Sequence, residues 1–168
     1  ADFINFCDAY DIPVLSLTNV KGYAADVRSE KSIAKAVAKL TYAFANANVP
    51  KVNVITGEAY GSAYVTMNSK ALGADVTYAW PDASIGMMDA NEAAKIMYAD
   101  DIAKSDDVQS VISEKAAEYA ALQSGVESAA ARGYVDTIIN PEDTRKYFAA
   151  AFEMLYTKRE YRPDKKHG

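Results

Sequence analysis

Two short apolar runs separated by an amphipathic segment constrain the fold of this chain more than any other feature. The runs span residues 12–18 and 51–56, and each has the length and apolar content of a buried strand. Between them lie apolar residues at the spacing of one helix face, namely Ile33, Val37, Leu40 and Phe44. A strand, a helix and a second strand in this order form a parallel pair with a right-handed crossover. The sequence therefore predicts an α/β fold.

The segments around this unit add further strands and helices. After a polar loop at residues 19–32 and the strand ending at Thr56, we expect a helix of small residues that runs to about Leu72 and ends at Gly73. Further strands are expected at residues 75–80, 84–88 and 135–139, and further helices at residues 3–10, 89–98 and 108–122. A last helix is expected to begin at Asn140, whose side chain can cap it, with Pro141 in the first turn.

Composition excludes several classes of function. The chain has 168 residues, enough for one domain, and its 18 basic and 23 acidic residues give a net charge of −5, which argues against a nucleic-acid partner. Cys7 is the single cysteine and His167 the single histidine, so we expect no disulfide framework, no metal site and no histidine-based mechanism. No stretch is long and apolar enough for a transmembrane segment, and a reducing cytoplasm is the expected compartment.

The turn after the second strand is the sharpest candidate site. From the strand end at Thr56, the chain is predicted to run through a turn with Gly57 and then Gly61, Ser62 and Ala63 into a helix. The first backbone N–H groups of that helix have no partner within it. Such groups can bind negative charge or a developing oxyanion, and a further N–H can come from the loop that contains Gly22. The alternative is that these small residues only allow close packing of helix and strand.

Other candidates have a stronger structural interpretation. Ser62 lies in a strand–turn–helix setting, but a nucleophilic serine needs a base, and His167 is near the end of the chain. Trp80 is better explained by packing than as a ligand platform. The acidic residues are better explained by helix capping, and the basic residues by a solvated tail or a subunit contact. The acidic set is Asp100, Asp101, Asp106 and Asp107, and the basic set is Lys158, Arg159, Arg162, Lys165 and Lys166.

Several sequence blocks resemble the C-terminal half of the biotin-dependent acyl-CoA carboxyltransferases. They follow the order of that family over essentially the whole chain and lie at residues 6–14, 38–44, 49–52, 59–64, 78–81, 131–136, 157–163 and 165–168. The family includes the carboxyltransferase subunits of propionyl-CoA carboxylases and the alpha subunits of methylmalonyl-CoA and glutaconyl-CoA decarboxylases. The resemblance implies a crotonase-like ββα spiral and a single domain over residues 1–168, either part of a longer chain or a split subunit.

The resemblance also implies a role for the candidate site. In the family, the active site lies between the N-terminal half of one subunit and the C-terminal half of another, within an oligomer. The first half binds acyl-CoA, and the second binds carboxybiotin delivered by a biotin carboxyl carrier protein. Applied to this sequence, the resemblance implies an oxyanion hole formed by the backbone N–H groups of Ser62, Ala63 and Gly22. It also implies that the cofactor is bound by Gly61, Ser62, Ala63, Tyr23 and Tyr64. No side-chain base is required, because the released biotin enolate takes the proton from the acyl-CoA.

The departures from the family lie on loops of this expected pocket. Lys21 stands where the family has proline, Ser62 and Asp89 replace glycines, and residues 32–38 lack the usual glycines. Two hypotheses follow, namely the biotin-side half of a carboxyltransferase and a non-catalytic assembly module with a degenerate pocket. A third hypothesis is another crotonase-fold enzyme. A hydratase would use Glu58 as its base, whereas a Clp-type peptidase would need a catalytic histidine that this sequence does not provide near the site.

Overall fold

A five-stranded parallel sheet forms the centre of the molecule. The structure is a computed structural model that describes residues 1–24, 26–105 and 107–160. The strands are β1 (Val14–Val20), β2 (Lys51–Tyr60), β3 (Val76–Ala79), β4 (Ser84–Gly86) and β5 (Thr137–Ile138). Their order is β1-β2-β3-β5, and β4 pairs with the end of β2. The predicted α/β class and the parallel β1–β2 pair are confirmed.

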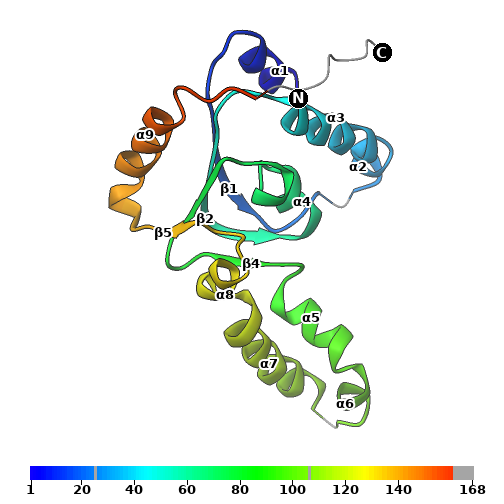
Figure 1. Cartoon of the computed structure of the whole chain (residues 1–168). Coiled ribbons are helices and arrows are strands. Elements are labelled where there is room, and N and C mark those ends of the chain that lie inside the picture. Colours follow the sequence, from blue (N-terminus) through cyan, green and yellow to red (C-terminus); the bar gives the residue numbers. More distant parts are fainter. Residues whose placement is uncertain (25, 106, 161–168) are drawn as a thin grey trace.

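Helices cover both faces of the sheet (Figure 1). They are α1 (Asp2–Ala9), α2 (Val27–Glu30), α3 (Ile33–Asn46), α4 (Gly61–Thr66), α5 (Ala90–Met97), α6 (Ala99–Ala103), α7 (Val108–Tyr119), α8 (Val126–Ala131) and α9 (Thr144–Met154). α9 packs with the side chains of Val52, Val54 and Tyr78, while α1 and α3 form a second apolar cluster around Phe44. A third cluster, around Ile55 and Ile85, lies beneath α4 and α8 and supports the candidate site.

Strand β2 continues four residues beyond its predicted end at Thr56. Its first half pairs with β3 and its last residues, Glu58–Tyr60, pair with β4, so the strand bends from one neighbour to the next. Two extra residues of β2 enter the β1–β2 ladder between the pairs Thr18–Ile55 and Val20–Ala59. The Asn19 side chain occupies this irregularity, and a Cβ on Gly57 would lie only 2.8 Å from its Oδ1 atom. Gly57 therefore permits this contact within the strand and does not begin the turn.

Three helical segments also differ from the prediction. The helix after β2 stops at Thr66 because Asn68 adopts a left-handed conformation with φ of 58°, and a separate 3-10 turn follows at Lys70–Leu72. The loop at residues 19–32 contains α2, whose first N–H groups are capped by Asp26. Asn140 makes no side-chain capping bond, since Pro141–Asp143 form a 3-10 turn and α9 begins at Thr144.

Lys158 anchors the segment after α9 to the sheet. The Lys158 side chain is only 8% exposed, and its Nζ atom lies 2.9 Å from the Asp75 carboxylate and 3.1 Å from that of Glu160. Nζ also donates to the Val49 carbonyl. The solvated-tail interpretation is therefore wrong for Lys158, and residues 161–168 lie outside the described part.

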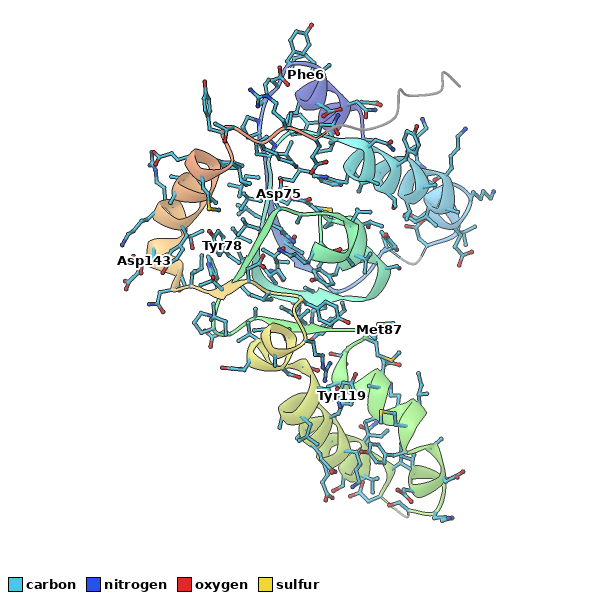
Figure 2. The ribbon with its side chains drawn as sticks, viewed as in Figure 1. Phe6, Asp75, Tyr78, Met87, Tyr119 and Asp143 are labelled. Atoms are coloured by element: carbon cyan, nitrogen blue, oxygen red, sulfur yellow. The ribbon has the colours of Figure 1, made fainter. Side chains whose placement is uncertain are left out.

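The helices α5, α6 and α7 form an arm that projects away from the sheet (Figure 1). α5 and α7 pack against each other (Figure 2), and their buried residues are Ala93, Ala94, Ile112 and Ala116. Asp107 caps α7 by accepting a hydrogen bond from the Ser110 N–H, as the capping interpretation predicts. Within residues 1–24, 26–105 and 107–160, no helix has the length and apolar content needed to cross a bilayer.

Candidate functional site

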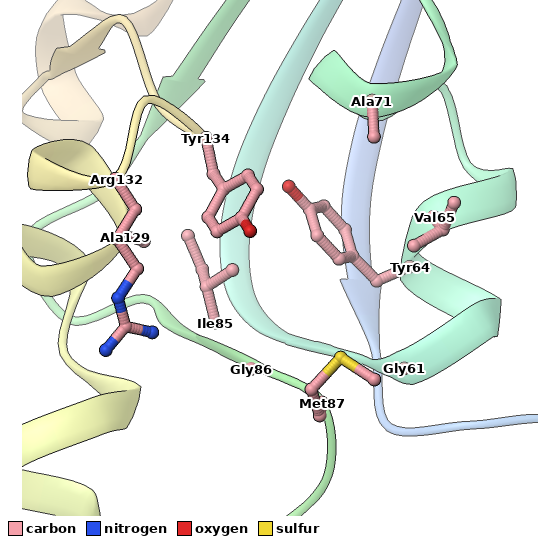
Figure 3. A pocket seen from close by; sticks show the side chains of 10 residues that line it. All are labelled: Gly61, Tyr64, Val65, Ala71, Ile85, Gly86, Met87, Ala129, Arg132 and Tyr134. Atoms are coloured by element: carbon pink, nitrogen blue, oxygen red, sulfur yellow. The ribbon is translucent and has the colours of Figure 1, made fainter.

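A pocket of about 240 Å³ opens between the start of α4, the end of β4 and the loop after α8 (Figure 3). Its walls are mostly apolar, with two tyrosines and one arginine. They comprise Gly61, Tyr64, Val65, Ala71, Ile85, Gly86, Met87, Ala129, Arg132 and Tyr134. Parallel strands place such pockets beside the turns that follow their carboxyl ends, which is where β2 and β4 end here.

The turn into α4 depends on Gly61. Its φ of 58° lies in the left-handed region, and a Cβ at this position would come within 3.0 Å of the Met87 carbonyl oxygen. Glycine therefore suits both the backbone conformation and the close approach of the chain after β4. Among the described residues, no side chain accepts a hydrogen bond from the first turn of α4. Its leading N–H groups are therefore uncapped.

The loop after β1 reaches α4 from the opposite side, through Tyr23. The Tyr23 hydroxyl donates to the Ser62 carbonyl at 3.2 Å and lies 2.8 Å from the Thr66 Oγ1 atom. Gly22 is exposed, and a Cβ added to it would meet no atom within 4 Å. The predicted proximity of this loop to the start of α4 is therefore present, and the space beside Gly22 is open.

An ion pair fixes the base of the same loop. Lys21 Nζ lies 3.0 Å from the Glu58 carboxylate, and the Glu58 N–H donates to the Asn19 side chain. The hydrogen bond with Glu58 raises the pKa of the Lys21 ammonium. A general base needs a carboxylate that is free to take a proton from substrate. The pairing of Glu58 with Lys21 therefore weakens the hydratase hypothesis.

Two tyrosine hydroxyls converge inside the pocket. Figure 3 shows the hydroxyl of Tyr64, from α4, and that of Tyr134, from the loop after α8, pointing into the same space. Burial raises the pKa of Tyr64 to about 12, with a smaller contribution from Tyr134. Arg132 lies at the edge, and its guanidinium donates to the Gln123 side chain. The pocket thus offers uncharged donors within and a positive charge at its rim.

The structure brings some of the predicted site residues together and separates others. Gly61 and Tyr64 line the pocket, whereas Ser62 is exposed beside Tyr23 and the Ala63 side chain is buried. Sequence reasoning missed Tyr134 as a site residue. Residues 131–136 resemble the family, but neither helical nor strand periodicity places them beside α4, because that contact depends on how the chain returns to the sheet after the arm.

The remaining candidates have structural roles where they are described. The Trp80 indole N–H donates to the Thr144 hydroxyl and the ring packs against the α9 cluster, which confirms the packing interpretation. Asp106 and His167 lie outside the described residues. In the described part of the chain, no three acidic, histidine or cysteine side chains gather in a way that could hold a metal ion.

Comparison with known proteins identifies relatives of the whole chain. The family model described as "Carboxyl transferase domain" matches residues 1–168. The chain is 44% identical to the methylmalonyl-CoA carboxyltransferase 12S subunit of Propionibacterium freudenreichii subsp. shermanii and 45% identical to the propionyl-CoA carboxylase carboxyltransferase subunit of Haloferax mediterranei. Each match covers 100% of this chain but only 32% and 33%, respectively, of the relative. The chain thus spans about a third of these relatives' length.

A solved structure resembles the fold equally closely. The transcarboxylase 12S crystal structure with methylmalonyl-CoA bound, described as a hexamer assembly, superimposes with a TM-score of 0.94 at 43% identity. The match covers 99% of this chain and 32% of the other. The predicted crotonase-like fold is confirmed.

Proposed function

Because this chain belongs to the carboxyl transferase domain family, we propose that it supplies the biotin-side half of an acyl-CoA carboxyltransferase active site. A separate half binds the acyl-CoA, of the propionyl- or methylmalonyl-CoA class named for its relatives. A biotin carboxyl carrier protein delivers the carboxylated cofactor, and the two halves meet in a cytoplasmic oligomer. The single observation that carries this proposal is the open pocket beside the uncapped first turn of α4.

The residues at this turn suit a ureido group. When bound, carboxybiotin supplies an activated carboxyl group and a ureido oxygen that gains negative charge as the carboxyl group leaves. The N–H groups of Ser62 and Ala63 would donate to that oxygen, and the Gly22 N–H would donate from the loop opposite. Backbone donors that are already oriented stabilise such charge without reorganising. Gly61, Tyr64 and Tyr23 would surround the cofactor.

Reconstitution tests the proposal. The purified chain is mixed with a CoA-side half, propionyl-CoA and carboxybiotin labelled on its carboxyl group, and label transfer to the thioester is measured. We expect transfer only when both halves are present. Transfer by this chain alone would contradict the division into two halves.

A pair of variants separates the backbone from the side chain at residue 62. Ser62→Pro removes one donor N–H at a first-turn position that tolerates proline, and should lower transfer about a hundredfold. Ser62→Ala keeps the N–H and should transfer like the wild type. Equal loss in both variants would indicate a hydroxyl-dependent reaction. No transfer in the reconstituted mixture, together with no binding of biotinyl peptide, would favour the assembly-module hypothesis.

A further inference from the structure

The Tyr64 side chain is largely buried, and its hydroxyl faces the pocket. Tyr64 is only 7% exposed, and the described residues provide no hydrogen-bond partner for its hydroxyl. Figure 3 shows the hydroxyl directed into the pocket. The hydroxyl is accessible from the open pocket and has no acceptor among the described residues, so it can donate to a group on a ligand that enters there.

Tyr134 faces Tyr64 from a firmly held loop. The Gly133 N–H donates to the Ala130 carbonyl and the Tyr134 N–H donates to the Ala129 carbonyl, which closes the end of α8. Gly133 has a φ of 81°, the left-handed conformation expected at such a helix end. The Tyr134 ring is therefore fixed at its base while its side chain stays 45% exposed, so that it can contact a ligand that enters the pocket.

The size and lining of the pocket restrict the ligand. A volume of about 240 Å³ is below the range of roughly 300–1,000 Å³ typical of sites for drug-sized molecules. Whole coenzyme A is therefore too large, whereas a small ring system or short acyl group would fit. Apolar walls from Ile85, Ala129 and Met87 favour an uncharged body, and the two hydroxyls favour a carbonyl acceptor.

We infer that Tyr134, together with Tyr64, is a ligand-positioning residue that holds a neutral cyclic urea by hydrogen bonds to its carbonyl oxygen or to an acceptor on its ring. This inference rests on the proposed function, because the cyclic urea is the ring of biotin. It adds a donor pair from the pocket wall to the backbone donors, and it assigns a role to Tyr134.

Binding measurements test this assignment. Biotinamide is titrated into the isotope-labelled chain, and backbone amide NMR shifts give the location and the dissociation constant. Tyr134→Phe and Tyr64→Phe each remove one hydroxyl while keeping the ring, and each should weaken binding about three- to tenfold, the effect of one hydrogen bond. The matched control is Tyr156→Phe, at an exposed position after α9, which should bind like the wild type. Thermal unfolding confirms that each variant is folded.

The outcomes separate this inference from the proposed function. Wild-type affinity in Tyr134→Phe, shift changes remote from the pocket, or no binding of biotinamide would overturn the inference. If Ser62→Pro loses biotinamide binding while Tyr134→Phe retains it, the inference falls and the proposed function stands. If the chain instead binds the short thioester propionyl-N-acetylcysteamine and not biotinamide, both the ligand class and the biotin-side assignment are overturned.

Discussion

The parallel sheet and the helical arm of residues 90–124 are held together in different ways. In the sheet, the branched side chains of Val52, Val54 and Ile55 are fully buried between helices on both faces. Among the described residues of the arm, the buried ones are three alanines, Ser124 and a single large apolar residue, Ile112, whereas Ile96, Met97 and Leu122 are exposed. Alanines let helices approach closely but remove little apolar area from water. The comparison predicts that stability resides in the sheet, whereas the arm opens more easily.

Truncating one large apolar side chain in each region tests this difference most strongly. Ile55 is 0% exposed, so Ile55→Ala should lower the free energy of unfolding by about 3 kcal/mol, through lost burial and a cavity. Leu122 is 65% exposed, so Leu122→Ala should change it by less than about 0.5 kcal/mol. Urea unfolding followed by circular dichroism measures both. Comparable losses would show that the arm is part of the same cooperative core.

The ion pairs of the two regions provide a second comparison. Lys158→Ala leaves the largely buried Asp75 carboxylate without its cation, and we expect a loss of about 2 kcal/mol. Lys115 forms a pair with Glu118 on the more exposed surface of the arm, so Lys115→Ala should leave the free energy of unfolding nearly unchanged. Unfolding midpoints with and without added salt measure these effects. A Lys158→Ala variant as stable as the wild type would refute the anchoring of the segment after α9.

Removing a helix cap tests whether the arm opens independently. Asp107→Ala deletes the acceptor for the Ser110 N–H at the start of α7 and should cost about 1 kcal/mol. Hydrogen exchange should accelerate in α5 and α7 while the amides of β2 and β3 keep their protection. Uniform acceleration across both regions would mean that the arm and the sheet unfold together.

The smallest effect at neutral pH concerns Tyr64. Burial raises the folded-state pKa of Tyr64 to about 12, above its ordinary value of 10.0, so the folded state holds the phenolic proton more tightly than the unfolded state. The corresponding stability is complete below pH 10 and is lost as the pH rises through 12. Tyr64→Phe should therefore flatten the decline of unfolding free energy between pH 10 and 12, with Leu122→Ala as the control. An unchanged slope would show that Tyr64 is not desolvated as the pocket requires.

The sequence by itself determined the α/β class, the parallel β1–β2 unit and the family. Ile33, Val37, Leu40 and Phe44 have helical spacing, and the apolar runs on either side have the character of buried strands, so local chemistry was sufficient there. The turn at Gly61 was also evident, because a left-handed glycine between a strand and a helix leaves a local signal. The proximity of Tyr23 to Ser62 followed from the parallel pairing of the strands before them.

Only the tertiary structure decided the extension of β2 and the composition of the pocket. β2 runs to Tyr60 because β4 pairs with its end, and no local propensity at Gly57 or Glu58 encodes that pairing. Tyr134 faces Tyr64 because the chain leaves the sheet, forms the arm and returns through α8. Lys158 is buried because its ammonium pairs with the carboxylate of Asp75, the residue just before β3. Contacts between residues distant in sequence depend on packing, which periodicity and residue preference do not specify.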